Sequence, residues 1–277
     1  MIGLGARLRA ATDARGALCV GIDPHAALLR AWGLPDTAAG ARELALRVVD
    51  AAAPRIGIVK PQAAFFERFG SAGIAVLEEV IRSARAAGLI VIGDAKRGDI
   101  GSTAEGYAAA WLAPGAPLES DALTVAPYLG LGALDPLIRI AQEAGNGVFV
   151  LASTSNPEGV AIQSARTSEG GTVAAAIALE ASRRNAPSAD AGEWGDIGLV
   201  IGATRPLGDS GIDGVDLSST PILAPGFGAQ GARLADIRSI FGAAAGTVIP
   251  SVSRSVLAAG PDGVATAIDA HRSELAA

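Results

Sequence analysis

Residues 89–103 read Leu-Ile-Val-Ile-Gly-Asp-Ala-Lys-Arg-Gly-Asp-Ile-Gly-Ser-Thr, an apolar run that passes directly into a charged one. The apolar part does not alternate with polar residues, which is typical of a parallel strand buried on both faces. Charged residues that close such a strand lie at its carboxyl end, where barrel enzymes carry their active sites. The segment therefore predicts a buried strand that delivers charged side chains to a site.

Similar apolar runs recur along the chain, and stretches with helical periodicity lie between most of them. The expected strands are residues 17–23, 56–61, 89–96, 122–127, 147–154, 197–204, 221–228 and 247–254. The expected helices are residues 38–53, 72–87, 104–112, 131–144, 173–185 and 263–273. Eight strands with helices between them, in about 250 residues, match an α/β fold of the (β/α)8 TIM-barrel type.

An open, doubly wound sheet is the alternative fold. It favours a glycine-rich dinucleotide turn after the first strand, but residues 21–25 read Gly-Ile-Asp-Pro-His and lack that spacing. No linker or repeat marks a second domain, so residues 1–277 are expected to form a single TIM-barrel domain. Long loops at 155–172 and 205–220 would follow the fifth and sixth strands, where such enzymes place ligand contacts.

The composition indicates a large buried core and argues against several classes of protein. Of the 277 residues, 50% are apolar and 18% are charged, which excludes a disordered chain, a coiled coil and a small disulfide-stapled domain. A net charge of −6 argues against nucleic acid or an anionic membrane as partner, and with 4% aromatic residues there is no platform for stacking bases. Any anionic ligand must therefore be held by local groups.

The cellular setting follows from the single cysteine and from the charges near the start of the sequence. Cys19 lies in an apolar run without a partner, which predicts a buried thiol in a reducing compartment. Charged residues interrupt any signal-peptide core in the first thirty residues: Arg7, Arg9, Asp13 and Arg15. No uncharged apolar stretch approaches the roughly 18 residues of a membrane span. We expect a cytoplasmic protein.

Polar residues end several of the expected strands, and all of them would face one mouth of the barrel. They are Asp23, Lys60, Asp94 with Lys96, Ser153 with Ser155, and Arg254. Alternation along a strand predicts that Asp94 and Lys96 share the inward face, with Asp99 in the glycine-flanked loop that follows. A structural ion pair followed by a capping box of Ser102 and Glu105 is the alternative interpretation.

The two lysines favour a catalytic interpretation of this cluster. Only Lys60 and Lys96 are lysines among the 22 basic residues, and both close adjacent expected strands. Arginine cannot readily donate a proton, whereas lysine can. Two lysines and two aspartates that converge in one pocket would form a network of alternating charge.

The ordered motifs resemble the orotidine 5′-phosphate decarboxylase family. Asp94-x-Lys96-x-x-Asp99, after Gly-Ile-Val-Lys-Pro-Gln at 57–62, is similar to that family's signature, and the form Asp-Ala-Lys-Arg-Gly-Asp-Ile is similar to its bacterial type 2 branch. Further matching segments span the chain at residues 21–24, 154–157, 225–231 and 252–254. The resemblance implies a lyase that converts orotidine 5′-phosphate to UMP in de novo pyrimidine biosynthesis, without a cofactor or metal.

The resemblance also implies a role for each residue of the site. Lys96 would give the proton to C6, Asp94 would lie beside the departing carboxylate, and Lys60 would complete the network. The residue matching Asp99 would come from the partner subunit, which implies a homodimer with shared active sites. Asp23 and, from the other subunit, Thr103 would contact the ribose. Ser155 would contact the pyrimidine, with Ser153 as a nearby competitor for that role. The remaining substrate contacts would come from Gly228, Gln230 and Arg254.

The glycine-rich loop at residues 226–231 and Arg254 have the chemistry of a phosphate site. Gly226, Gly228 and Gly231 would expose backbone N–H groups, Gln230 adds an amide, and Arg254 can form a fork on phosphate oxygens. Loops after the seventh and eighth strands form the usual phosphate site of barrels. A tight turn without a ligand is the simpler alternative for the glycine-rich loop.

Simpler interpretations exist for other residues, and two other functions remain open. Asp23 could form a turn, Thr103 could cap a helix, and His25 and His271 lack metal-ligand spacing and are expected to be surface or packing residues. One of the two functions is a metal-dependent sugar-phosphate decarboxylase or synthase on the same barrel, whose acidic residues would hold Mg²⁺. Lys60 argues against it, because its positive charge would repel the metal ion. A non-catalytic barrel that binds a phosphoribosyl ligand would have no need of the lysine–aspartate cluster.

Overall fold

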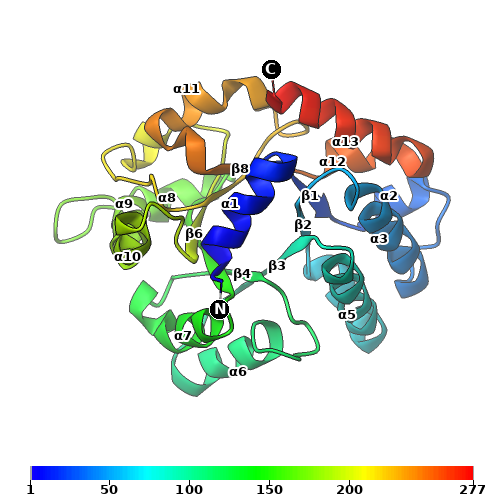
Figure 1. The fold of residues 1–277 in the computed structure, drawn as a ribbon, viewed down its shortest axis with the longest axis horizontal. Helices are drawn as coiled ribbons and strands as arrows, with labels where there is room; N and C mark the ends of the chain where they lie inside the picture. Colours follow the sequence, from blue (N-terminus) through cyan, green and yellow to red (C-terminus); the bar gives the residue numbers. More distant parts are fainter. Residues whose placement is uncertain (1, 277) are drawn as a thin grey trace.

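The computed structural model describes residues 2–276, which form a closed barrel of parallel strands arranged in chain order (Figure 1). The strands are β1 (Cys19–Ile22), β2 (Ile58–Pro61), β3 (Ile90–Arg97), β4 (Ala122–Val125), β5 (Gly147–Ser153), β6 (Ile197–Ile201), β7 (Ile222–Pro225) and β8 (Val248–Val252). β1 pairs with both β2 and β8, so Cys19 lies opposite Ile58 and Ser251. The predicted barrel is confirmed, with each predicted strand present and its ends shifted by at most three residues.

Helices surround the barrel and cover the outer faces of its strands (Figure 1). They are α1 (Leu4–Arg15), α2 (Ala26–Ala31), α3 (Ala38–Ala52), α4 (Ala64–Glu67), α5 (Gly70–Ala86), α6 (Gly101–Trp111), α7 (Asp135–Glu143), α8 (Val160–Gln163), α9 (Val173–Arg184), α10 (Ala186–Asp190), α11 (Ile237–Phe241), α12 (Arg254–Leu257) and α13 (Gly260–Ala276). Short 3₁₀ turns lie at Leu131–Leu134, Pro157–Gly159, Leu207–Ser210, Leu234–Asp236 and Gly242–Thr247. Among these described residues, no helix is long and apolar enough to cross a membrane.

The predicted helices correspond to α3, α5, α6, α7, α9 and α13, with residues Leu131–Leu134 forming a 3₁₀ turn before α7. Most of the unpredicted helices have only four to six residues, too few for a periodic pattern. The longer α1 was missed because it buries a narrow set of residues, Leu4, Gly5 and Leu8. It lies across the amino-terminal end of the barrel, where Arg7 donates to Asp121 Oδ1 at 2.5 Å.

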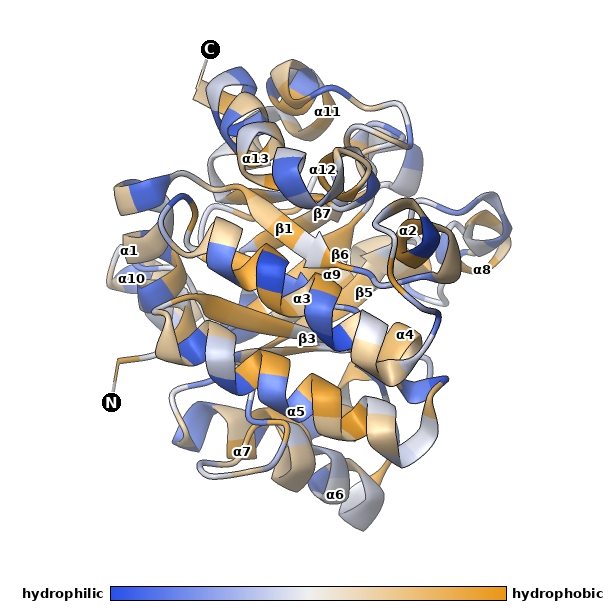
Figure 2. Cartoon of the chain, turned by 90° about the vertical axis from the view of Figure 1, so that its right-hand side faces the viewer, coloured by the Kyte–Doolittle hydropathy of each residue, from blue (hydrophilic) through white to orange (hydrophobic). Residues whose placement is uncertain are grey.

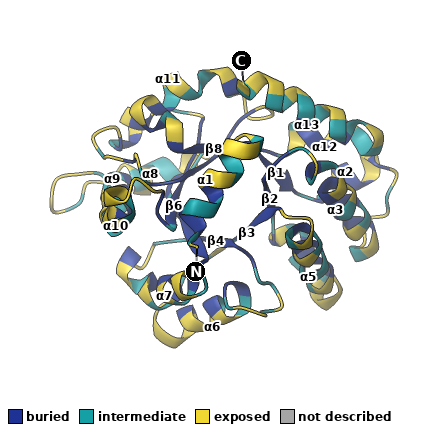
Figure 3. Cartoon of the chain, in the orientation of Figure 1, coloured by how far each residue is buried: buried dark blue, intermediate teal, exposed yellow. Residues whose placement is uncertain are grey.

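Two layers of apolar side chains hold the barrel together. Alternate strand residues point into the barrel, including Ile58, Ile92, Phe149 and Ile249, or outward against the helices, including Val59, Val91 and Leu123. The strands are hydrophobic along their length, whereas the surrounding helices carry hydrophilic residues on their outer sides (Figure 2). The same helices are buried on the inner side and exposed on the outer one (Figure 3). The continuous apolar runs of the sequence thus correspond to strands buried on both faces.

One irregularity in the sheet determines the geometry of the site. β3 and β4 pair at Gly93 with Leu123 and again at Arg97 with Val125, so residues 94–96 of β3 oppose Thr124 alone. Within this bulge Lys96 has a φ of 49°, the one positive φ of a non-glycine residue among those described. The expectation that Asp94 and Lys96 share the inward face is confirmed, since their side chains contact each other, but the strand between them is bulged rather than regular, as strands often are next to active sites.

Candidate active site

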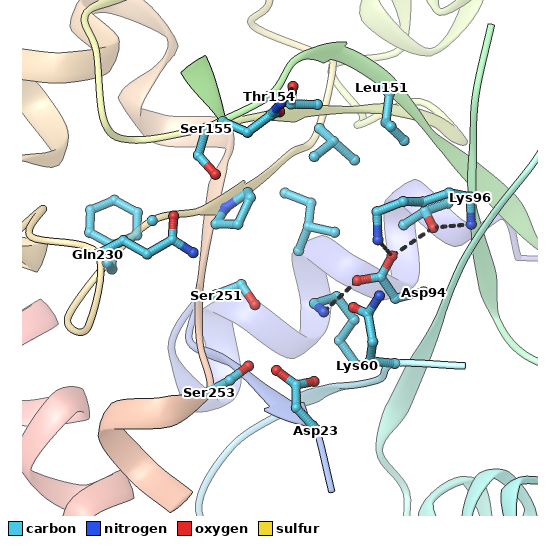
Figure 4. A pocket seen from close by; sticks show the side chains of 18 of the residues that line it. Asp23, Lys60, Asp94, Lys96, Leu151, Thr154, Ser155, Gln230, Ser251 and Ser253 are labelled. Carbon is cyan, nitrogen blue, oxygen red and sulfur yellow. Dashed lines mark hydrogen bonds and ion pairs between the residues drawn. The ribbon is translucent and has the colours of Figure 1, made fainter. Parts of the chain in front are cut away.

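A cavity of about 550 Å³ opens at the carboxyl ends of the strands. Its charged and polar lining residues are Asp23, Lys60, Gln62, Asp94, Lys96, Thr124, Thr154, Ser155, Asn156, Gln163, Gln230, Ser251, Ser253 and Arg254. The lysine–aspartate cluster lies on one side of the cavity, and Ser155 and Gln230 lie on the other (Figure 4). A ligand that reaches both sides must be elongated, with different chemistry at its two ends.

Asp94 lies between the two lysines of the chain. Lys60 Nζ donates to Asp94 Oδ2 at 2.6 Å, and Lys96 Nζ donates to Asp94 Oδ1 at 2.5 Å. The side chains of Lys60 and Asp94 are each 8% exposed, whereas that of Lys96 is 45% exposed. Gln62 adds a further link when its amide is oriented to satisfy both neighbours: it then donates to Asp94 Oδ2 at 2.5 Å and accepts from Lys96 Nζ at 3.2 Å. Lys96 and Asp94 thus meet across the bulge of β3.

The electrostatics of this cluster keep Asp94 and Lys60 charged. Burial alone would raise the pKa of Asp94, but the ammonium groups of Lys60 and Lys96 outweigh it and hold that pKa well below its usual range. Burial alone would lower the pKa of Lys60, but the carboxylates of Asp94 and Asp23 outweigh it and leave that pKa above its usual value. A fixed negative charge therefore lies between two positive groups inside the barrel mouth.

Asp99 and Thr103 lie outside the cavity of their own chain. Asp99 Oδ1 accepts from the backbone N–H of Ile100 at 2.8 Å, and Thr103 is exposed on the first turn of α6. The helix begins after Ile100 without a side-chain cap, so the alternative interpretations of Thr103 as an N-cap and of Ser102 with Glu105 as a capping box are wrong. Both Asp99 and Thr103 remain available to a group outside this chain.

The glycine-rich loop after β7 lies beside Arg254, as the sequence predicted, but its backbone is arranged differently. The N–H of Gly228 donates to Ala232 O and that of Gly231 donates to Gly228 O, so both are used inside the loop. Gly228 does not line the cavity; with φ of 68°, it allows the turn, and a Cβ there would lie 2.7 Å from Ser255 Oγ. The expectation that these two glycines offer N–H groups to a ligand is wrong.

Other groups of this loop are free to bind an anion. Within residues 2–276, the backbone N–H groups of Ala229 and Gln230 donate to no protein acceptor, and both residues line the cavity. The exposed guanidinium of Arg254 likewise has no acidic partner in the described part of the chain. Two N–H groups, an amide and an unpaired guanidinium suit a phosphate.

Asp23 and Ser155 line the cavity from the ends of β1 and β5. Asp23 Oδ1 is buried and, among the described residues, has no hydrogen-bond partner, so it is free to accept from a ligand hydroxyl. Ser155 lines the cavity, whereas its competitor Ser153 is 7% exposed and does not. His25 caps α2 by accepting from the N–H of Leu28 at 3.4 Å, which is a packing role.

Several lining residues were not singled out from the sequence. Gln62, Thr124, Thr154, Gln163, Ser251 and Ser253 are polar residues within or just after apolar runs. For Gln62, Thr154, Ser251 and Ser253 the available signal was a position in or next to an expected strand, but polar residues at strand ends also serve turns and caps. Gln163 lies at the end of α8 and had no such signal. Thr124 had a stronger signal, because it lies in the middle of the run Ala-Leu-Thr-Val.

These features define a (β/α)8-barrel enzyme whose carboxyl-end mouth is suited to a small anionic molecule. The comparisons with known proteins are more specific. The model of the orotidine 5′-phosphate decarboxylase / HUMPS family matches residues 16–269, and the chain belongs to this family.

Relatives align over almost the whole chain. An orotidine 5′-phosphate decarboxylase of Salinispora arenicola is 54% identical over 272 residues, covering 98% of this chain and 96% of the relative. That of Streptomyces coelicolor is 53% identical over 269 residues, covering 97% and 94%. A crystal structure from Streptomyces avermitilis has a TM-score of 0.93 at 49% identity and covers 100% and 95%. Leishmania donovani OMP decarboxylase has a TM-score of 0.76 at 32% identity and covers 98% and 99%.

Proposed function

We propose that this chain decarboxylates orotidine 5′-phosphate to UMP without a cofactor, with Lys96 as the proton donor. The observation that carries the proposal is the Lys60–Asp94–Lys96 cluster, in which Lys60 and Asp94 are buried and both contacts to Asp94 are 2.6 Å or less. The names of the relatives support the reaction, and the cluster supplies a mechanism for it.

The chemistry explains why such a cluster is needed. Loss of CO₂ breaks the bond between C6 and the carboxylate and leaves its electron pair on C6, in the plane of the ring, where the ring π-system cannot delocalise it. Asp94 would face the substrate carboxylate, and Lys96 would stabilise the developing carbanion and transfer its proton to C6. The partial exposure of Lys96 lets water return a proton to the amine afterwards.

One charge pair cannot lower the barrier enough. A unit pair at 4 Å contributes about 4 kcal/mol at an effective dielectric of 20, whereas enzymes lower barriers by roughly 8–23 kcal/mol. Binding energy from a distant part of the substrate must contribute. The 5′-phosphate, held by Gln230, Arg254 and the free N–H groups of the loop, would supply it, with Asp23 at the ribose and Ser155 at the pyrimidine.

We further propose a homodimer in which each subunit completes the site of the other. Asp99 and Thr103 would enter the partner's cavity, which agrees with their position outside their own. The loop of Asp99 packs beside the loop after β4, since Ala126 N donates to Arg97 O at 2.8 Å. Large apolar side chains are exposed on these two loops, Ile100 at 60%, Tyr128 at 82% and Leu129 at 56%. Such a patch beside an incomplete site suits a second copy of the chain.

The two alternative functions fit the site less well. A Mg²⁺ ion at Asp94 would lie beside two ammonium groups that repel it. Among the described residues no group of three or more His, Cys, Asp or Glu side chains could hold a metal ion. A barrel that only binds a phosphoribosyl ligand would not need two lysines on one carboxylate. We place the enzyme in the cytoplasm, in pyrimidine biosynthesis, with no nucleic acid or membrane partner.

A direct assay tests the proposal. Purified protein is mixed with orotidine 5′-phosphate, with and without a chelator, and the loss of the substrate's ultraviolet absorbance is followed. We expect turnover that the chelator does not change. Absence of turnover contradicts the proposed reaction, and loss of turnover with chelator supports the metal-dependent alternative.

A further inference from the structure

Thr124 links the backbone of Lys96 to the carboxylate that the Lys96 side chain contacts. The hydroxyl of Thr124 accepts from the Lys96 backbone N–H at 3.0 Å and donates to Asp94 Oδ1 at 3.0 Å. Asp94 Oδ1 in turn accepts from Lys96 Nζ at 2.5 Å. A closed ring of hydrogen bonds therefore leads from the main chain of Lys96 through Thr124 and Asp94 back to the ammonium of the same lysine.

The bulge explains why this hydroxyl is needed. Since residues 94–96 oppose Thr124 alone, the Lys96 N–H has lost the carbonyl partner that a regular ladder would supply. Thr124 is 1% exposed, so its hydroxyl is buried together with the Asp94 carboxylate that it contacts. A positive φ at a residue with a long side chain persists only where the surroundings enforce it. The Thr124 hydroxyl satisfies the strained amide and, with its single proton, also fixes Asp94.

We propose that Thr124 is a positioning residue for the decarboxylation, holding Lys96 and Asp94 in the geometry that proton transfer to C6 requires. This inference rests on the proposed role of Lys96 as proton donor. Thr124 acts through Lys96 and Asp94. Loss of its hydroxyl frees both the strained backbone and one carboxylate oxygen, so the ammonium points at C6 in fewer molecules.

The test compares side chains of matched shape with and without the hydroxyl. Thr124→Val keeps the volume and removes the hydroxyl, whereas Thr124→Ser keeps the hydroxyl. We expect Thr124→Val to lower kcat roughly 10- to 100-fold, the range for losing a hydrogen bond to a charged group, with KM and UMP affinity within about threefold of wild type. Thr124→Ser should retain kcat within about threefold of wild type.

A second pair keeps the test decisive if Thr124→Val does not fold. Thr124→Ala and Thr124→Ser differ by the hydroxyl alone, and the serine should exceed the alanine in kcat by about tenfold or more. Equal kcat values in each matched pair, or a loss that appears in KM alone, overturn the proposal. Lys96→Ala, measured in the same assay, separates failure of the proton-donor assignment from failure of the Thr124 proposal. If Lys96→Ala stays active, the proton-donor assignment fails, whatever the Thr124 variants show.

Discussion

Lys96 Nζ lies 2.5 Å from Asp94 Oδ1, and the backbone of Lys96 has a positive φ of 49°. The contact is made across a bulge in β3, which gives Lys96 this unusual backbone conformation. The bulge leaves the Lys96 side chain 45% exposed while Asp94 remains buried. One end of this contact is thus buried, and the other is accessible from the cavity and from solvent.

The first prediction concerns Lys96 itself. Lys96→Ala should abolish turnover, because it removes the proposed proton donor to C6, while UMP should still bind through the proposed phosphate and ribose contacts. Lys96→Arg is the matched control: it keeps the charge but should also be inactive, because a guanidinium does not readily give up a proton. Turnover and UMP binding are measured by absorbance and by calorimetry. An active Lys96→Ala enzyme contradicts the assignment.

The second prediction concerns Arg254. Arg254→Ala should lower kcat/KM for orotidine 5′-phosphate about 100-fold or more, because a charge-assisted fork on the phosphate is lost. It should also weaken UMP binding much more than uridine binding. Arg233→Ala is the control, since Arg233 is an exposed arginine paired with Asp236. Equal losses for UMP and uridine would show that Arg254 does not contact the phosphate.

The third prediction concerns stability and pH. Asp94→Asn leaves Lys60 and Lys96 without their carboxylate, and breaking a buried pair costs about 3–5 kcal/mol of unfolding free energy. The folded-state pKa of Asp94 lies below its unfolded value of about 3.9, so its stabilisation is complete above that value and declines as pH falls toward the folded pKa. Because the pKa of Lys60 is raised above its usual value, the stabilisation that its charge contributes is lost only at strongly alkaline pH.

Urea unfolding of wild type and Asp94→Asn measures this difference across pH. The difference in unfolding free energy between wild type and Asp94→Asn should be constant from about pH 6 to 9 and should become smaller below about pH 4. Asp36→Asn, which breaks an exposed pair with Arg68, serves as the control and should change stability little. A gap that widens in acid would mean that Asp94 is not held ionised by the lysines.

The fold was predictable from the sequence because buried parallel strands leave long apolar runs, and Asp94 and Lys60 were predictable because charges at the ends of such runs stand out. The bulge was not predictable, because it depends on how β3 pairs with β4 around Thr124. The role of Gly228 was misjudged for a similar reason: a glycine pattern shows that a turn is present but not which N–H groups the turn consumes. The short helices left no periodic signal.

The last prediction tests the shared site. Asp99→Ala and Lys96→Ala should each be inactive alone, since each would remove one part of every proposed composite site. When the two are mixed and allowed to exchange subunits, half of the dimers contain one of each chain, and each of these has one intact site. About a quarter of the wild-type activity should return. Mixing Lys96→Ala with Asp94→Ala is the control: both residues belong to the same chain's cavity, so a mixed dimer has no intact site and activity should stay absent. If the first mixture also stays inactive while exchange is confirmed by mass spectrometry of the mixed dimers, Asp99 does not act in the partner's site.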